Sequence, residues 1–545
     1  MRECENFCWV VLPQFFNVIM FVVLLHCVGA MPCACPKKTN CIVRIKNSIV
    51  AWYITQRLKF IDSYWKNPID IQDRTLKNLL AAAKNTEVGK LYGFSDITNS
   101  NQFKNTLPVQ QYDDFKIYVD RMMAGEDNLI WASKIKWFAK SSGTTNDKSK
   151  FLPISKEAFN QTHYLAGRDT LALYCRNNPN TEMFLGKGII MGGSHSINTE
   201  NPNIRSGDLS AVLLQNLIPL ARYLSSIDLS ISLMDDWEMK LQKLADQYIP
   251  LDVTSISGVP SWTLILLKKI LEMTGKEHIN EIWPNFEVYI HGGVSFEPYR
   301  DQFAKLLPSH KTKFIQTYNA SEGFFGIQDT NEQDDMLLML DYGIYYEFIP
   351  FNEFENEHPR TLSLEEVELG KIYAMVISTN AGLWRYNIGD TIQFTSLKPF
   401  RIKVVGRVKH FLNTFGEEVM VHNTDKALAR VCAKLGLKVV EYTVAPIYMT
   451  DKNIGGHEWL IEFENPPQNL NQFAEILDSE LKKVNSDYEA KRYKNLALQM
   501  PLIQVAKKNA FHNWLKSKNK LGGQHKIPRL FNKRIYLEEI LASFE

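Results

Sequence analysis

A run rich in hydroxyl groups, KSSGTTNDKSK at residues 140–150, extends a β-like segment. Hydroxyls and main-chain N–H groups can wrap a polyphosphate, and a lysine such as Lys150 can neutralise the charge on a departing pyrophosphate. The run is not a Walker A loop, because the pattern G-x-x-x-x-G-K-[ST] is absent from the chain. A Ser/Thr-rich surface turn accounts for the same residues, so this run alone leaves both interpretations open.

Two further runs place small residues at the ends of β-like segments: YIHGGVS at residues 289–295 and QTYNASEGFFG at residues 316–326. Glycine lets a backbone approach a planar base closely, because it carries no β-carbon. Tyr318 could stack on such a base, and Glu322 could hold a magnesium ion between phosphate groups. The alternative is that Tyr318 is a core aromatic residue and that the glycines form ordinary turns.

A carboxylate stands directly after a glycine in LWRYNIGD at residues 383–390. Asp390 could accept hydrogen bonds from both hydroxyls of a ribose, since an ionised carboxylate is only an acceptor. An Asp after a Gly in a hairpin turn is also commonplace. Near the end of the chain, Lys526 follows the glycines of KLGGQHK and could swing onto a phosphate or a carboxylate.

Metal and nucleophile patterns are absent from the sequence. The three histidines nearest these runs, His163, His195 and His291, do not have the spacing of a metal site, and no Ser/His/Asp arrangement is legible. Six of the eight cysteines lie in the first 41 residues, which leaves only Cys175 and Cys432 in the rest of the chain. So few cysteines indicate a cytosolic protein.

The elements that must position these residues alternate between helical and strand-like patterns, which predicts an α/β fold. Apolar residues at helical spacing over residues 45–94 predict two helices, with Asp73 in a plausible cap region. Residues 367–395 alternate like strands and are interrupted by glycine turns, which predicts an antiparallel meander. The pattern restarts after Gly406-Arg407, so we expect a domain boundary there.

The composition is that of a globular protein with two or three cores: 545 residues, 45% of them hydrophobic and 22% charged. The formal net charge of +2 gives no indication of nucleic-acid binding. The segment 480–534 is locally basic, with 14 Lys or Arg against three acidic residues. It could meet an anionic substrate, or it could be the solvated face of lysine-rich helices.

An apolar stretch at residues 8–30 is long enough to span a bilayer, although Pro13, Gln14, Asn17 and His26 interrupt it. Three interpretations remain open: a cleaved signal peptide, a membrane anchor, or a start-site artefact with Met31 as the true start. The basic residues that follow the stretch would keep the rest of the chain on the cytoplasmic side of a membrane. We therefore expect a cytoplasmic enzyme with a possible N-terminal anchor.

The order of these runs resembles the adenylate-forming superfamily. More narrowly, SSGTTNDKSK, YNASEGFFG and LWRYNIGD are similar to three motifs of the auxin-responsive acyl-acid amido synthetase family (Gretchen Hagen three), in its bacterial branch. The resemblance covers roughly residues 45–545. The apolar, cysteine-rich leader at residues 1–36 precedes it. The resemblance implies a large N-terminal ATP- and acyl-binding domain at residues 37–408 and a small mobile C-terminal domain at residues 409–545.

The resemblance also implies roles for single residues. It assigns the phosphates to Ser141, Ser142, Gly143, Thr144, Thr145 and Lys150. It assigns the adenine and acyl pocket to His291, Gly292, Gly293 and Val294, and the adenine and metal site to Tyr318, Ser321 and Glu322. It assigns the ribose to Asp390 and Arg407, and closure on the adenylate to Lys526. The catalytic residues would be Lys150, Glu322 and Lys526, with ATP and Mg²⁺ as cofactors.

The implied activity is a ligase reaction in two halves: a carboxylic acid becomes an acyl-AMP with release of pyrophosphate, and an amino acid's amine then takes the acyl group. Two departures put the acceptor in doubt, Gly323 and the run Gly416-Glu417-Glu418, and Asn146-Asp147 stands where a glycine is usual. The alternatives are an acyl-CoA ligase and a non-catalytic small-molecule binding protein of the same fold. We expect small-molecule partners, no nucleic acid, and a monomer. The sequence does not name the acid or the amine.

Overall fold

The computed structural model describes most of the chain after residue 35. The described residues are 36–141, 150–192, 195–197, 201–225, 227–234, 237–293, 296, 299–354, 356–407, 411–412, 419–447, 455–485, 488–489, 492, 498–518, 520, 526–531 and 533–543. The apolar leader, most of the hydroxyl-rich run and Val294 lie outside these ranges, as do Asn146-Asp147 and Gly416-Glu417-Glu418.

Helices open the described chain: α2 (Pro36–Thr55), α3 (Leu58–Ile61), η1 (Asp62–Trp65), α4 (Pro68–Ala83), α5 (Glu87–Leu91), α6 (Ser100–Thr106) and α7 (Tyr112–Ala124). The prediction of only two helices over residues 45–94 is wrong, because the chain turns at residues 56–57 and again after Trp65. The predicted cap at Asp73 is also wrong. Helix α4 begins at Pro68, whose fixed φ suits the first helical position.

One sheet of ten strands organises the N-terminal part of the chain, with the order β11-β12-β13-β14-β10-β9-β8-β7-β6-β3. Its parallel strands are β3 (Lys187–Ile190), β6 (Val253–Gly258), β7 (Val288–Gly292) and β8 (Lys313–Ala320). Its antiparallel strands are β9 (Gly323–Ile327), β10 (Met336–Leu338), β11 (Ile344–Pro350), β12 (Ile372–Thr379), β13 (Tyr386–Leu397) and β14 (Phe400–Arg407). The predicted antiparallel meander is therefore confirmed as β12 and β13.

A second sheet has the order β2-β1-β5-β4, from β1 (Trp137–Ser141), β2 (Lys150–Ile154), β4 (His195–Ile197) and β5 (Arg205–Gly207). The helical elements between the strands are η2 (Ala158–His163), α8 (Tyr164–Asn177), α9 (Leu209–Gln215), α10 (Pro219–Ser225), α11 (Leu229–Ser232), α12 (Trp237–Tyr248), α13 (Pro260–Thr274), η3 (Ile279–Glu281) and α14 (Arg300–Leu306), followed by η5 (Phe351–Glu353) and η6 (Leu364–Glu366). The predicted α/β fold class is confirmed.

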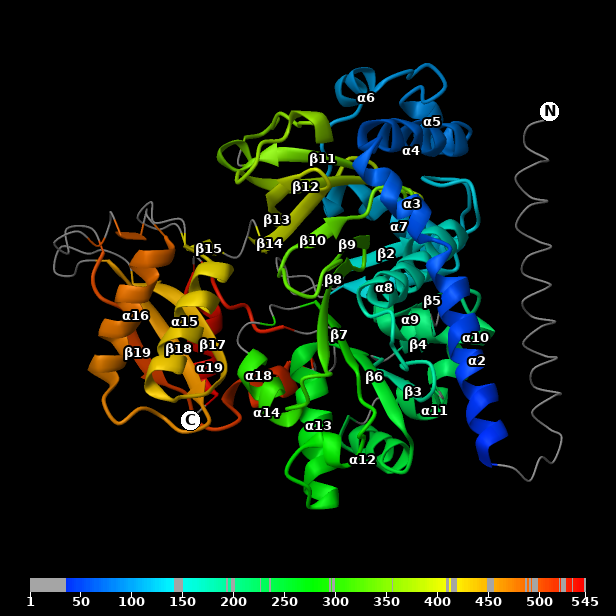
Figure 1. Ribbon diagram of the computed structural model, residues 1–545. Helices are drawn as coiled ribbons and strands as arrows, with labels where there is room; N and C mark the ends of the chain where they lie inside the picture. The colour runs from blue at the N-terminus through cyan, green and yellow to red at the C-terminus, as the bar shows by residue number, and fades with distance from the viewer. Residues whose placement is uncertain are drawn as a thin grey trace.

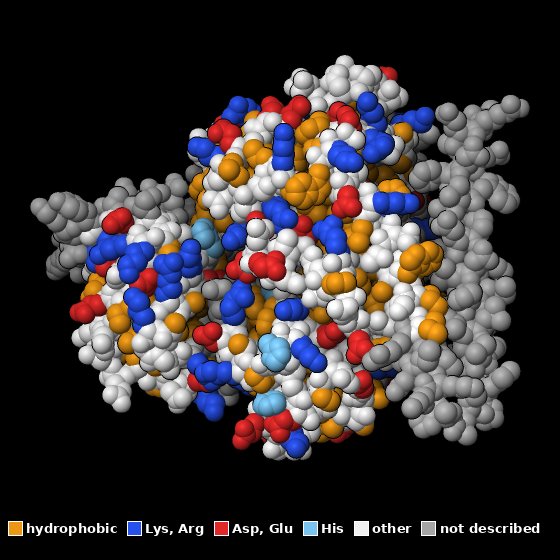
Figure 2. All heavy atoms as spheres, viewed as in Figure 1, with side chains coloured by type: hydrophobic (Ala, Val, Ile, Leu, Met, Phe, Trp, Pro, Cys, Tyr) orange, Lys and Arg blue, Asp and Glu red, His pale blue; other side chains and the backbone are white. Residues whose placement is uncertain are grey.

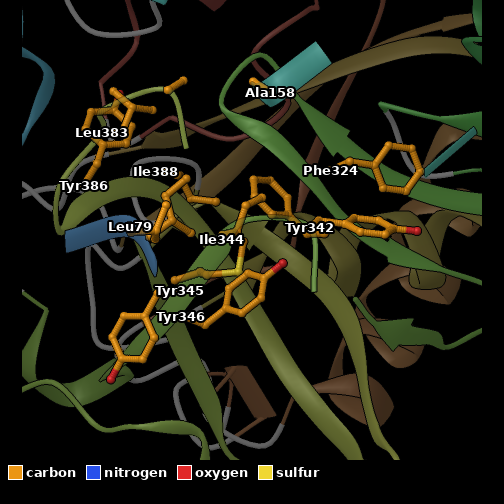
Figure 3. Close-up of a cluster of buried hydrophobic side chains, with 14 of the residues drawn as sticks. Leu79, Ala158, Phe324, Tyr342, Ile344, Tyr345, Tyr346, Leu383, Tyr386 and Ile388 are labelled. Carbon is orange, nitrogen blue, oxygen red and sulfur yellow. The ribbon is translucent and has the colours of Figure 1, made fainter. Parts of the chain in front are cut away.

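A buried aromatic and aliphatic cluster joins the run at residues 316–326 to the run at residues 383–390. Phe324 of β9 lies edge-on to Tyr342 with 6.2 Å between the ring centroids. Tyr386 and Ile388 of β13 belong to the same cluster, which Figure 3 shows in close-up. Because core side chains pack at crystal-like density, this cluster fixes the end of β8 relative to the start of β13.

The C-terminal part of the chain, residues 411–543, has its own core. Its elements are β15 (Phe411–Leu412), β16 (Val419–Met420), α15 (Val421–Leu435), β17 (Val439–Ile447), β18 (Gly456–Phe463), α16 (Leu470–Val484), β19 (Leu502–Val505), α18 (Ala510–Ser517) and α19 (Ile535–Ala542). Figure 1 draws this part in yellow, orange and red beside the large sheet, with α13 and α14 on the side that faces it.

The basic segment 480–534 carries many of its lysines in ion pairs on the surface. Lys482 pairs with Asp478 at 2.6 Å, and Lys518 pairs with Glu539 at 3.1 Å. Figure 2 shows Lys and Arg side chains gathered on the visible face of the C-terminal part, with acidic side chains among them. The lysines of these pairs are partly exposed, which is typical of a solvated helix face.

None of the helices in the described ranges has the length and the continuous apolar stretch that a bilayer crossing requires.

Candidate active site

A hydrogen bond joins two of the predicted site residues, Tyr318 on β8 and Asp390 on β13. The hydroxyl of Tyr318 donates a hydrogen bond of 2.7 Å to Oδ2 of Asp390, and both side chains are buried. Gly389 precedes Asp390 inside β13 with φ +77°, a conformation that favours glycine, at a point where the pairing with β12 is irregular. The Tyr318 ring also packs on Phe325 at 4.9 Å, which makes it partly a core residue.

Two glycines end the neighbouring parallel strand β7. A β-carbon on Gly292 would lie 2.6 Å from the carbonyl oxygen of Thr317, and Gly293 has φ +82°. Thr317 in turn donates its hydroxyl to the carbonyl oxygen of His291 at 3.2 Å. The carboxyl ends of β7 and β8 therefore lie close together, and no side chain of β7 separates them at Gly292. Ligands of open α/β sheets bind at this end of the parallel strands.

His291 precedes these glycines on β7, and its side chain is neutral at neutral pH. Burial, together with the positive charge of Arg300, lowers the pKa of His291 to about 3. Its ring stacks on Phe296 with 4.0 Å between the centroids. Its buried Nδ1 atom has no hydrogen-bond partner among the described residues. A neutral imidazole can orient a polar group but does not carry a proton at neutral pH.

The hydroxyl-rich run connects β1 to β2, and its two ends face each other, with Ser141 paired to Lys150. Ser142, Gly143, Thr144 and Thr145 lie outside the described residues, and so does the side chain of Ser141. The Nζ atom of Lys150 lies 5.4 Å from the centre of the Tyr112 ring. Tyr112 also accepts a 2.9 Å hydrogen bond from the backbone N–H of Phe151.

The segment that contains Tyr112, whose ring lies near Lys150, also contacts the strand that carries Asp390. Gln110, two residues before Tyr112, exchanges backbone hydrogen bonds of 2.9 Å with Arg385 and Asn387 around the start of β13. Residues 110–112 thus connect the hairpin of Lys150 to the strand that carries Asp390. Sequence reasoning missed Tyr112, because an aromatic residue at the start of a helix carries no local sign of this contact.

Ser321 and Glu322 form the turn between β8 and β9. Ser321 is buried and Glu322 is half-buried. A β-carbon on Gly323 would lie 2.7 Å from Cδ1 of Ile344, so a larger residue there would have to displace the end of that side chain. No cluster of three or more His, Cys, Asp and Glu side chains suited to a metal occurs in the described part of the chain. Magnesium at Glu322 would take its other ligands from phosphates and water, as this ion commonly does.

Lys526 reaches the site from the C-terminal part. The segment after it is fixed to β17: Thr443 donates its hydroxyl to the Pro528 carbonyl oxygen at 2.7 Å, and Val444 N–H donates to the Arg529 carbonyl oxygen at 2.8 Å. A β-carbon on Gly293 would lie 4.0 Å from Nζ of Lys526. An ammonium group beside bare backbone is suited to an anionic ligand.

Arg407 pairs through its backbone with Asp390, while its side chain and Val294 lie outside the described residues. Arg385, in the same run as Asp390, is structural. It adopts φ +44°, bonds Glu347 at 2.8 Å and donates to the carbonyl oxygen of Lys104 at 2.7 Å. The structure therefore brings together Gly292, Gly293, Tyr318, Asp390, Lys526 and the backbone of Arg407.

The residues present suit a nucleotide with its phosphates. The glycines keep side chains away from this end of β7, the Asp390 carboxylate can accept hydroxyl hydrogens, and Lys526 supplies a cation. Sequence reasoning missed Thr317, although it stands inside a quoted run, because its role depends on the register of β7 and β8.

Comparison with known proteins identifies the family of the chain. The chain matches the GH3 family N-terminal domain at residues 57–312, the central domain at residues 337–407 and the C-terminal domain at residues 422–535. It is 25% identical to indole-3-acetic acid-amido synthetase GH3.3 of Arabidopsis thaliana, over 87% of this chain and 91% of the relative. It is 25% identical to jasmonoyl-L-amino acid synthetase JAR6 of Nicotiana attenuata, over 87% and 93% respectively.

A solved GH3.15 acyl acid amido synthetase has the same fold, with a TM-score of 0.71 at 18% identity, over 89% of this chain and 95% of that one. The predicted fold of an adenylate-forming enzyme is thus confirmed. The three domain matches together cover well over half of the 545 residues. The chain belongs to the GH3 family.

Proposed function

We propose that the chain is an ATP-dependent acyl-acid amido synthetase. The carboxylate of an organic acid attacks the α-phosphorus of ATP, which forms acyl-AMP and releases pyrophosphate. The amine of an amino acid then attacks the acyl carbon, which forms an amide, AMP and a proton. The observation that carries this proposal is the meeting of Tyr318, Asp390 and Lys526 around the bare backbone of Gly292 and Gly293.

Each residue has a proposed part in the first half-reaction. Asp390, held by Tyr318, accepts the ribose hydroxyls, and Arg407 assists from the next strand. Lys150 and the hydroxyls of Ser141, Ser142, Thr144 and Thr145, with the N–H of Gly143, bind the phosphates that leave as pyrophosphate. Gly292, Gly293 and Val294 line the adenine and acyl pocket beside Ser321. Magnesium at Glu322 would offset the repulsion between two anions.

Lys526 is proposed to contact the adenylate from the C-terminal part. We place the domain boundary at residues 408 and 409, between the large sheet and the second core, and we propose that the small domain rotates there between half-reactions. Support comes from the separate cores on either side of the boundary. Identical domain orientations in ATP-bound and AMP-bound crystals would contradict the rotation.

The relatives support an amino acid as the acceptor. Besides the enzymes named for indole-3-acetic acid and jasmonate, a 4-substituted benzoates-glutamate ligase GH3.12 of Arabidopsis thaliana is 22% identical over 85% of this chain. The acid is proposed to be a small organic acid of this kind. The bacterial branch stays a prediction, supported only by the low identity to these plant enzymes.

Pyrophosphate exchange into ATP, measured with a library of carboxylic acids, tests the first half-reaction. Exchange that depends on an added acid is expected of an enzyme, whereas a binding protein gives none. Amino acids and coenzyme A are then offered to the adenylate in parallel. Amide formation supports the proposal, and a thioester as the only product identifies an acyl-CoA ligase.

We propose a cytoplasmic location for the described part of the chain. Its two cysteines, Cys175 and Cys432, are both free, as expected in a reducing compartment. The N-terminal anchor and the monomeric state stay predictions. Expression of the chain from Met1 and from Met31, followed by separation of membranes, tests whether residues 1–30 hold the protein at a membrane.

A further inference from the structure

Strand β14 is irregular at Val405, shortly before its end. On the neighbouring strand β13, Thr391 pairs with Gly406. The next residue, Ile392, pairs with Val404, so the register skips Val405. A β-bulge of this kind leaves the extra residue outside the ladder of the sheet. Val405 is nevertheless buried, so its carbonyl oxygen needs a partner from another element.

His422, in the first turn of α15, bonds this carbonyl oxygen. Its Nδ1 atom lies 2.8 Å from the carbonyl oxygen of Val405. Because a carbonyl oxygen only accepts hydrogen bonds, Nδ1 carries the proton and donates. Nε2 then accepts, and it lies 3.1 Å from the side-chain nitrogen of Asn423. Burial lowers the pKa of His422, which favours this neutral form.

Asn423 fixes the histidine within the C-terminal part of the chain. Its side-chain oxygen accepts a 2.9 Å hydrogen bond from the backbone N–H of Met420, and its side-chain nitrogen donates to the carbonyl oxygen of Val484 at 3.0 Å. Val484 is the last residue of α16. The ring of His422 is therefore held by two helices of the C-terminal part while it bonds a strand of the large sheet.

Close packing surrounds the same hydrogen bond. Val405 of β14 and Met420 before α15 belong to one buried apolar cluster, although they come from different parts of the chain. A β-carbon on Gly406 would lie 3.8 Å from Cβ of Met420 and 3.8 Å from the backbone nitrogen of Val421. Helix α15 thus begins in van der Waals contact with β14.

We infer that His422 is a positioning residue whose hydrogen bond to Val405 holds α15 on the bulge and sets the backbone of Arg407 beside Asp390. This inference rests on the proposed function, in which Arg407 and Asp390 hold the ribose. Arg407 follows Val405 by two residues and pairs with Asp390. Without the histidine, a buried carbonyl loses its partner, and the bulge is no longer fixed at this position of the strand.

Three substitutions of His422 in the full chain test the inference. His422→Asn places an amide N–H close to the position of Nδ1, His422→Gln places one close to the position of Nε2, and His422→Phe keeps only a ring. In pyrophosphate exchange, His422→Phe and His422→Gln should raise the KM for ATP by about fivefold, as expected from the loss of one hydrogen bond. His422→Asn should stay within about twofold of wild type. The KM for the carboxylic acid should not change in any variant.

The same split is expected in the second half-reaction. The KM for chemically prepared acyl-AMP, which carries the ribose, should rise in His422→Phe and His422→Gln, whereas the KM for the amino acid should not change. A purely structural role would lower the amount of active protein and leave every KM unchanged. Equal KM values for ATP in His422→Asn and His422→Gln would overturn the inference, and so would a wild-type value in His422→Phe.

His457→Phe is the matched control. His457 is a buried histidine of the C-terminal part, and its ring centroid lies 5.8 Å from that of Tyr488 rather than against the large sheet. The variant should keep the wild-type KM for ATP, even if it lowers stability. A rise equal to that of His422→Phe would overturn the inference, because any loss of a buried histidine would then have the same effect.

Calorimetric titration with ATP in the absence of an acid gives a readout that does not need turnover. The affinity should fall by about fivefold in His422→Gln and stay at the wild-type value in His422→Asn and His457→Phe. An unchanged affinity in His422→Gln would overturn the positioning role. Wild-type protein without acid-dependent exchange would instead contradict the proposed function, so the two failures are distinguishable.

Discussion

The hydroxyl of Tyr318 bonds the carboxylate of Asp390 at 2.7 Å, and this bond joins the last parallel strand of the large sheet to a strand of its antiparallel half. The bond orients the carboxylate of Asp390. Asp390 is therefore preorganised to accept a ligand hydroxyl, rather than free to rotate. Preorganised polar groups stabilise a transition state without the cost of reorientation.

Removal of this carboxylate should slow adenylate formation. Asp390→Ala and Lys150→Ala are each expected to lower pyrophosphate exchange by at least about tenfold, or about 1.4 kcal/mol of transition-state stabilisation. Asp120→Ala, which removes an exposed carboxylate paired with Lys116 on α7, is the control and should exchange at the wild-type rate. Near-wild-type exchange in both site variants would refute the site assignment.

Local sequence patterns predicted those features that depend on local chemistry. The run LWRYNIGD predicted a carboxylate after a glycine at the end of a strand, but Gly389 and Asp390 lie inside β13, where glycine at positive φ accompanies an irregularity in the pairing with β12. Alternation predicted the meander, because successive residues of a strand face opposite sides. The helix start at Pro68 was missed. Asp73, in the middle of an amphipathic run, resembled a helix cap, but the helix begins five residues earlier at a proline, whose fixed φ suits the first helical position.

Long-range contacts were not predictable from such patterns. Whether Tyr318 stacks on a ligand or packs in the core depends on which strand lies beside β8, and the structure gives it a buried ring and a hydrogen-bonded hydroxyl. Thr317 and Tyr112 acquire their contacts only from strand register and from packing between distant segments. A single sequence carries no local signal for either.

A side chain at position 292, at the end of β7, is expected to collide with β8 and lower activity. Gly292→Ala would place a methyl group 2.6 Å from the Thr317 carbonyl oxygen, so β7 and β8 must move apart at the site. We expect exchange to fall by at least about tenfold. Gly167→Ala is the control, since nothing lies within 4 Å of its β-carbon in helix α8, and it should stabilise the protein by about 0.5–1 kcal/mol. Equal activity of the two variants would contradict the steric argument.

Arg385 is expected to matter for stability. Its substitution by Ala leaves Glu347 buried and unpaired, which should lower the free energy of unfolding by about 3–5 kcal/mol in urea denaturation. Lys116→Ala breaks an exposed pair with Asp120 and should cost about 0.5 kcal/mol or less. Similar losses in the two variants would mean that the Arg385–Glu347 pair is not structural.

Buried His291 predicts a dependence of stability on pH. Its native pKa of about 3 lies below the ordinary value of 6.5, so the unfolded chain binds a proton at a higher pH than the native protein does. Stability should therefore fall as the pH decreases from about 6.5 toward 3, by up to about 1.4 kcal/mol per pH unit from this group. His291→Gln should flatten that slope in urea titrations, whereas the exposed His310→Gln should not. An unchanged slope in His291→Gln would show that other groups cause it.

The fate of the acid's oxygen atoms tests the acyl-adenylate most directly. When the carboxylate attacks the α-phosphorus, one of its oxygens bridges carbon and phosphorus, and the amine later breaks the carbon–oxygen bond. With a carboxylic acid labelled with ¹⁸O, mass spectrometry should therefore find one labelled oxygen in each AMP released alongside the amide. Unlabelled AMP, or label in inorganic phosphate with ADP as the product, would contradict the account.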